Sequence, residues 1–119
     1  MRNEIMWWMS RLTIMLTSLF LSFSLAQSAW ATEVTMGSNG NLVFEPNDIT
    51  INAGDTVTFT NGALPPHNMI VKDHPELSHG DLAFATGDSF DVTFPDAGDF
   101  EFQCDPHAGA GMKGVIHVQ

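Results

Sequence analysis

The sequence has 119 residues, 44% of them hydrophobic, and its 14 acidic residues against 4 lysines and arginines give a net charge of −10. Such a charge repels nucleic acid and anionic lipid and favours association with basic proteins, so nucleic-acid binding is excluded. All but one of the acidic residues lie after residue 31, where Lys72 and Lys113 are the only bases.

Residues 1–31 have the three parts of a secretory signal peptide. Arg2 and Arg11 lie near its start, residues 12–26 carry no charge, and the segment ends in the A-x-A pattern of residues 29–31. A membrane anchor is the alternative, but the uncharged run of 15 residues is shorter than the about 20 that a spanning helix needs. We therefore predict a cleaved signal peptide at residues 1–31 and one domain at residues 32–119.

Beyond residue 31, apolar and polar residues alternate with a period of two, which predicts strands with one buried and one solvated face. In chain order the predicted strands are 33–36, 42–45, 49–53, 56–60, 67–72, 90–94, 100–104 and 114–118. Residues 76–84 lack clear alternation, and we expect one short helical turn there. About eight short strands separated by turn signals predict an all-β fold, a two-sheet antiparallel Greek-key β-sandwich.

The apolar side of these strands predicts a core rich in phenylalanine. Its expected members are Phe44, Ile49, Ile51, Val57, Phe59, Phe90, Val92, Phe94, Phe100, Phe102 and Val118. No disulfide contributes, because Cys104 is the one cysteine of the sequence. A lone cysteine in an exported protein is either buried and inert or bound to something.

The strongest chemical signal is the spacing C-x2-H-x4-M, formed by Cys104, His107 and Met112 in one loop between two predicted strands. Pro106 stiffens this loop, and its two glycines permit tight backbone turns. Thiolate, imidazole and thioether are soft donors that select copper, and two His, one Cys and a weak Met define a blue-copper electron-transfer site. Taken singly, the cysteine or the methionine is more simply explained as core packing. Their occurrence together in nine residues favours a metal site.

The second histidine that such a site needs is His67, which begins an apolar strand directly after two prolines. His74 and His79 lie in a polar stretch, and we expect them to be solvated. His117 falls between apolar residues of a regular strand, on the opposite face, which argues against a ligand role.

Segments 42–46, 66–68, 82–90 and 104–114 resemble the plastocyanins, which are cupredoxins, and the resemblance extends over essentially all of residues 32–119. The fuller pattern P-H-x-G-A-G-M-x-G of residues 106–114 is more specific to plastocyanins than C-x2-H-x4-M, which pseudoazurins also have. Residues 82–90 are similar to the cyanobacterial branch. The resemblance implies one copper ion cycling between Cu(II) and Cu(I). Its implied ligands are His67, Cys104, His107 and Met112, and Asn68 would tie the ligand loops together through hydrogen bonds.

The same resemblance implies a soluble, monomeric one-electron carrier and no enzyme activity. It would move electrons from cytochrome f of the cytochrome bf complex to photosystem I by transient docking in the thylakoid lumen, without stable membrane insertion. The implied partner-binding residues form a flat apolar patch around the ring edge of His107. They are Gly40, Leu42, Leu64, Pro66, Ala108 and Ala110.

Three features depart from common plastocyanin patterns. Gln103 replaces a tyrosine that marks a second docking region, the neighbouring acidic patch is reduced to residues 73–76, and Ala108 replaces an arginine of many cyanobacterial relatives. We therefore expect electrons to enter and leave through His107.

Other functions fit the same residues less well. A pseudoazurin-like periplasmic donor to a respiratory or nitrogen-oxide reductase would have an identical copper site and a different partner. Copper storage or delivery favours labile, Met-rich or Cys-x-x-Cys sites. A Cys–His hydrolase needs substrate room beside its thiolate, and an inward strand position for Cys104 leaves none.

Overall fold

The computed structural model describes residues 31–119, so the predicted signal peptide, apart from its last residue, lies outside the described residues. The strands are β1 (Thr32–Ser38), β2 (Asn41–Glu45), β3 (Asp48–Ile51), β4 (Thr56–Asn61), β5 (His67–Val71), β6 (His79–Ala83), β7 (Ser89–Thr93), β8 (Gly98–Gln103) and β9 (Lys113–Val118). Two short 3-10 helices, η1 (Pro75–Leu77) and η2 (Asp105–Ala110), complete the fold. Within the described part of the chain, no helix is long and apolar enough to cross a membrane.

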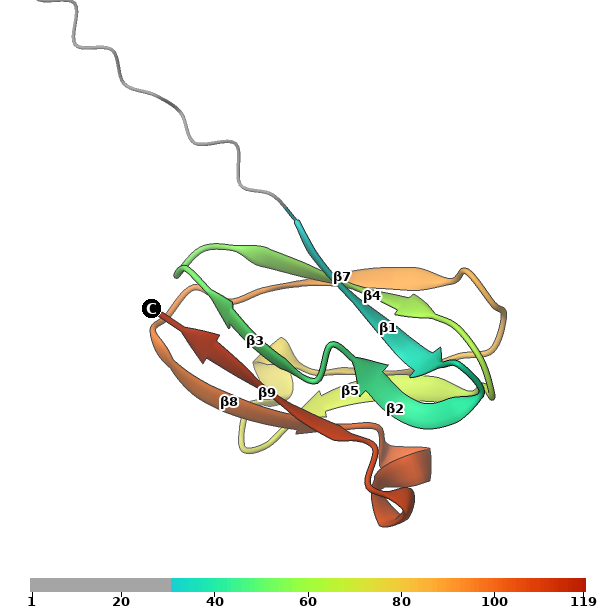
Figure 1. Ribbon diagram of the computed structural model, residues 1–119. Helices are drawn as coiled ribbons and strands as arrows, with labels where there is room; N and C mark the ends of the chain where they lie inside the picture. The colour runs from blue at the N-terminus through green and yellow to red at the C-terminus, as the bar shows by residue number, and fades with distance from the viewer. Residues whose placement is uncertain (1–30) are drawn as a thin grey trace, which may run out of the picture.

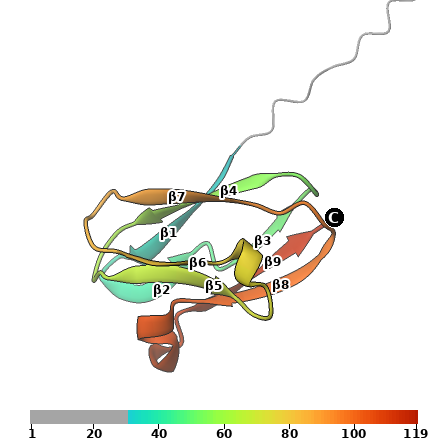
Figure 2. The same cartoon turned by 180° about the vertical axis from the view of Figure 1, so that it is seen from behind.

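The strands form two sheets that pack face to face (Figures 1 and 2). One sheet has the order β2-β1-β4-β7 and the other the order β3-β9-β8-β5-β6, which confirms the predicted β-sandwich. The sheets are mixed and not wholly antiparallel, because β1 pairs with β4 and β3 pairs with β9 in parallel. Alternation predicts which side of a strand is buried, but a strand running in either direction buries the same side. Strand direction therefore did not follow from the pattern.

The core joins the two sheets through phenylalanine rings. Phe44 on β2 lies 4.7 Å from Phe102 on β8 and 6.3 Å from Phe59 on β4, measured between ring centroids. Each buried phenylalanine contributes about 1.5–3 kcal/mol to folding. All the predicted core residues are buried except Phe90, which is partly buried and stacks on Phe59.

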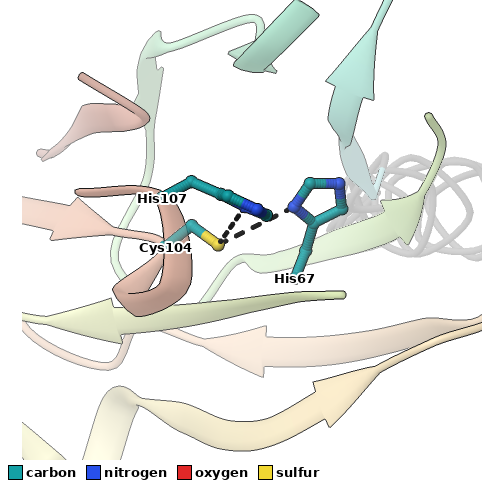
Figure 3. A group of neighbouring side chains, drawn as sticks. All are labelled: His67, Cys104 and His107. Atoms are coloured by element: carbon teal, nitrogen blue, oxygen red, sulfur yellow. Dashed lines mark hydrogen bonds between the residues drawn. The ribbon is translucent and has the colours of Figure 1, made fainter. Parts of the chain in front are cut away.

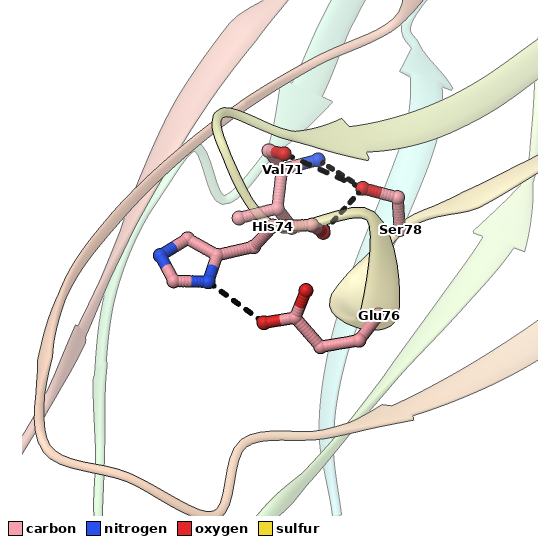
Figure 4. Close-up of polar contacts among 4 residues, drawn as sticks. All are labelled: Val71, His74, Glu76 and Ser78. Carbon is pink, nitrogen blue, oxygen red and sulfur yellow. Dashed lines mark hydrogen bonds and ion pairs between the residues drawn. The ribbon is translucent and has the colours of Figure 1, made fainter.

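The segment without alternation contains a helical turn and a ninth strand. The turn η1 is held by Ser78, whose Oγ donates to the His74 carbonyl at 2.9 Å and accepts from the Val71 N–H at 2.8 Å (Figure 4). The strand β6 was missed because it forms an edge of its sheet and has one buried residue, Ala83, so it lacks the two-residue period of a half-buried strand.

Candidate metal centre

Three potential ligands meet where β5 begins and β8 ends. These two strands pair antiparallel, with Ile70 opposite Gln103, so the start of β5 lies beside the end of β8. This pairing places His67, at the start of β5, near Cys104, which directly follows β8. Directly after Cys104 the chain forms η2, which carries His107 and projects from one end of the sandwich (Figure 1). Distant segments of the sequence are thus brought together by strand pairing.

The donor atoms of these three side chains point toward one another (Figure 3). The Cys104 Sγ lies 3.7 Å from His67 Nδ1 and 3.5 Å from His107 Nδ1. One donor atom from each residue falls within 4.8 Å of the other two, and among residues 31–119 this is the one such cluster of His, Cys, Asp or Glu. His67 and Cys104 are fully buried, whereas His107 is partly exposed. The cluster therefore reaches solvent on the His107 side.

Met112 closes the loop that carries Cys104 and His107. The Cys104 N–H donates to the Met112 carbonyl at 3.0 Å, and the Met112 N–H donates to the His107 carbonyl at 3.3 Å. Gly111, at φ +86°, makes the left-handed turn that returns the chain to β9. Met112 is completely buried, so its thioether is shielded from solvent.

Asn68 connects the two chain segments that carry the candidate ligands. Its Oδ1 accepts the N–H of Asp105 at 2.9 Å, and its Nδ2 donates to the Gly80 carbonyl at 3.2 Å. Asn68 is buried, so losing either partner would leave a costly unsatisfied polar atom. The side chain thus links β5 and β6 to the backbone immediately after Cys104.

The ring of His67 is oriented by a backbone carbonyl. Its Nε2 lies 2.7 Å from the Ala63 oxygen, and a carbonyl can only accept a hydrogen bond. Nε2 therefore carries the proton, and the lone pair of the neutral ring is on Nδ1, the nitrogen that faces Cys104. A second hydrogen bond of this kind is typical of histidines that bind metals.

Burial controls protonation in the metal-free site. Desolvation is the main reason that the pKa of the Cys104 thiol is raised and the pKa of His107 is lowered, and the nearby His67 lowers the latter further. Both shifts favour the neutral forms, so the metal-free site favours a neutral Cys104 thiol and a neutral His107 ring. A bound cation reverses this for sulfur, because metal coordination deprotonates a thiol. One thiol, two imidazoles and a buried thioether fit copper.

The remaining histidines are engaged elsewhere. His74 Nδ1 contacts Glu76 Oε1 at 2.8 Å (Figure 4), and His117 lies between Asp48 and Asp99. The expectation that His79 is solvated was wrong, because its ring stacks on Phe90 with centroids 3.8 Å apart and its Nδ1 is buried. That stacking bridges β6 and β7, which belong to different sheets, and the sequence pattern did not place them together.

The apolar residues expected to face a partner differ in exposure. Leu64 is 50% exposed, Gly40 and Ala110 are exposed, and Leu42, Pro66 and Ala108 are partly buried. Sequence reasoning missed Phe84, which is 67% exposed. Its neighbours Ala83 and Ala85 accept hydrogen bonds from the Asn61 side chain, so Phe84 lies on the segment packed against the end of β4.

The fold and this donor set define a class of protein, the cupredoxins, in which a β-sandwich holds one copper ion at its end. Comparison with known proteins identifies the family, since residues 31–119 match the sequence model of the copper-binding proteins of the plastocyanin/azurin family. The chain belongs to this family.

Relatives to which this chain is similar include several plastocyanins. The chain is 45% identical to a chloroplastic plastocyanin of Tetradesmus obliquus over 106 residues, covering 82% of this chain and 73% of that protein. It is 48% identical to the plastocyanin of Scenedesmus fuscus over 96 residues, covering 72% and 97%. The oxidised plastocyanin of Dryopteris crassirhizoma superposes with a TM-score of 0.66 at 30% identity, covering 74% and 100%. The protein is thus a copper-binding blue-copper electron carrier.

Proposed function

We propose that the protein shuttles electrons from cytochrome f of the cytochrome bf complex to photosystem I, with His67, Cys104, His107 and Met112 as the copper ligands. The observation that carries this proposal is the meeting of three buried or half-buried donor atoms within 4.8 Å of one another, under a loop whose tip is uncharged. Relatives at 41–48% identity are plastocyanins, which supports the photosynthetic partners over other acceptors.

The closed site supports electron transfer and no catalysis. Bound copper would supply a one-electron Cu(II)/Cu(I) couple. Cys104 is completely buried, so it has no space beside it for a substrate. The hydrogen bonds of His67 and of the residue after Cys104 hold the ligands before the metal arrives. A preorganised site changes little between two charge states, which favours fast one-electron exchange.

His107 is the proposed point of electron entry and exit. It is partly exposed, whereas His67, Cys104 and Met112 are buried, so it is the one proposed ligand that approaches the surface. Ala108, Gly109 and Ala110 follow it without a charged or bulky side chain. A partner can therefore approach the ring closely and leave quickly.

The side of the molecule at Gln103 has a different character. Gln103 lines a surface groove of about 750 Å³ together with Lys72, Lys113 and Glu101, and these two lysines are the only bases among the described residues. Asp48 and Glu101 line the same groove, so its acidic and basic side chains balance and it offers no concentrated negative charge to a basic partner. We therefore propose that the general negative charge steers partners and that they dock at the His107 end.

Substitutions at the proposed docking surface test this function. Leu64→Asp and Ala108→Asp should each slow electron transfer with both cytochrome f and photosystem I by at least about tenfold, because an unpaired charge at a desolvated contact costs on the order of 1.4 kcal/mol or more. Laser-flash kinetics measure both reactions. Leu64 has φ +57°, a conformation that aspartate tolerates, so this variant should fold.

Ala53→Asp is the matched control, since it adds the same charge at an exposed turn that pairs with the C-terminal residue, at the other end of β9 from η2. Equal rates for the control and the two docking variants would refute the docking surface. Slow wild-type reaction with both photosynthetic partners would favour the alternative, a periplasmic donor to a reductase.

We also propose that residues 1–31 are removed and that residues 32–119 work in the thylakoid lumen, as the chloroplastic relatives suggest. All three tryptophans lie in residues 1–31, and the sequence has no tyrosine. The processed protein should therefore absorb very weakly in the near ultraviolet, with phenylalanine as its only aromatic chromophore. Tryptophan absorption in protein isolated from its native membrane fraction would contradict the cleavage.

A further inference from the structure

Gly37, near the end of β1, lies against the proposed copper site although it contributes no donor atom. It is buried and has φ +81°. A Cβ atom built on it would overlap the carbonyl oxygen of Ala63 and would lie 2.8 Å from His67 Nε2. Both neighbours are fixed, one being backbone and the other a buried ring. No side chain fits at this position without displacing them.

The carbonyl of Ala63 reaches His67 because the two backbone segments pair closely. The Ala63 N–H donates to the Gly37 carbonyl and the Gly62 N–H donates to the Met36 carbonyl, each at 2.8 Å. These bonds continue the parallel pairing of β1 with β4 past the end of β4. Gly62 is equally constrained, because a Cβ there would overlap the Gly37 carbonyl oxygen. Both positions must therefore be glycine for the two backbone segments to lie this close together.

We propose that Gly37 is a positioning residue for the copper site: its missing side chain lets the Ala63 carbonyl reach His67 and so selects the ring nitrogen that faces Cys104. The hydrogen bond at 2.7 Å puts the proton on Nε2 and leaves Nδ1 as the free donor, 3.7 Å from the sulfur. A strand of the opposite sheet thereby determines the geometry of a ligand on β5. This inference rests on the proposed role of His67 as a copper ligand.

Gly37→Ala tests the proposal, with Gly54→Ala as the matched control. Gly54 has φ +91°, and a Cβ there would have no heavy atom within 4 Å, so the control carries comparable backbone strain without the contact. We expect Gly37→Ala to lower copper affinity by about 10–100-fold, the usual effect of removing a partner that orients a metal ligand. It should also shift the thiolate-to-copper absorption band and the electron paramagnetic resonance hyperfine splitting of the copper-loaded protein.

Gly54→Ala should leave the copper affinity and both spectra unchanged, although each variant lowers the melting temperature. General destabilisation does not alter the spectrum of molecules that remain folded and loaded. The proposal is overturned when Gly37→Ala matches Gly54→Ala in affinity and spectra.

A measurement on the unaltered protein covers the case in which Gly37→Ala fails to fold. Nitrogen-15 NMR of the metal-free wild type at pH 8, above the reference histidine pKa of about 6.5, reports the tautomer of each neutral ring. We expect a single Nε2–H tautomer for His67. A mixed population or the Nδ1–H form would overturn the proposal.

His67→Gln separates this inference from the function on which it rests. If His67→Gln loses copper affinity while Gly37→Ala keeps the copper affinity and spectra of the wild type, the role of Gly37 is refuted and the ligand set stands. Unchanged copper affinity and absorption in His67→Gln refutes the ligand role itself.

Discussion

Two histidines in different regions of this molecule have opposite surroundings. His67 is completely buried, its Nε2 bonds a carbonyl, and its Nδ1 faces a thiol. His117 is partly exposed and its ring lies between two carboxylates, with Nδ1 2.7 Å from Asp99 and Nε2 3.1 Å from Asp48. The first environment fixes one ring nitrogen as a donor and leaves the other facing a sulfur, and the second favours a charged ring with two donors. Two histidines of one protein therefore differ in their capacity to bind a metal because their neighbours differ.

The largest effect should come from removing the sulfur that lies beside His67, and it should be seen in the visible absorption. Cys104→Ser should abolish the visible absorption of the oxidised protein, because a hydroxyl cannot supply the thiolate charge transfer. Asp99→Asn, which changes a neighbour of His117 instead, should leave that absorption intact. Visible spectra after copper addition measure both, and circular dichroism shows whether each variant is folded. An equally blue Cys104→Ser protein would end the copper assignment.

Copper removal should have the next largest effect, a decrease in melting temperature. This decrease should be the same with or without the interactions of His117. At a free copper concentration about 1,000 times the dissociation constant, binding adds about 4 kcal/mol to stability. For a domain of this size, that corresponds to a decrease in melting temperature of roughly 15–30 °C on chelation. Calorimetry of wild type and His117→Gln, each with and without copper, measures it.

The copper-dependent shift should be equal in the two proteins, because His117 shares no hydrogen-bond partner with the site. A shift that depends on His117 would show that the two regions are coupled and that they cannot be treated as independent.

The smallest effect is a pH dependence that belongs to His117. Its pKa is raised, mainly by the hydrogen bond that its ring donates to the Asp99 carboxylate and further by the charge of Asp48. A pKa that is higher in the folded than in the unfolded state stabilises the fold fully below the unfolded value of about 6.5. That contribution is lost as the pH rises through the raised folded pKa.

Urea unfolding of the metal-free proteins over a pH series tests this prediction. Wild type should exceed His117→Gln in stability most at pH values below about 6, and the difference should shrink at alkaline pH. The other ionisable groups are the same in both proteins, so they do not contribute to the difference. A difference that grows with pH would reverse the assigned sign.

The core and the loop of the site were predictable from short stretches of sequence. Phe100 and Phe102 alternate with polar residues, and this alone predicts a strand with a buried face. Cys104, His107 and Met112 fall within nine residues, so one loop had to carry all three. The signal in each case is local, and each residue's chemistry identifies its role.

The sequence by itself thus determined the β-sandwich, its phenylalanine core and a soft donor set suited to copper. Tertiary structure alone decided the parallel pairing of β1 with β4, the edge strand β6 and the close approach of Gly37 to Ala63 and His67. The physical reason is that a periodic pattern records whether a side chain is buried, whereas these features depend on which distant backbone lies beside it. The tautomer of His67 follows from such a contact, since Gly37 and Ala63 meet only when β1 pairs with β4, and this sheet packs on the one that carries His67.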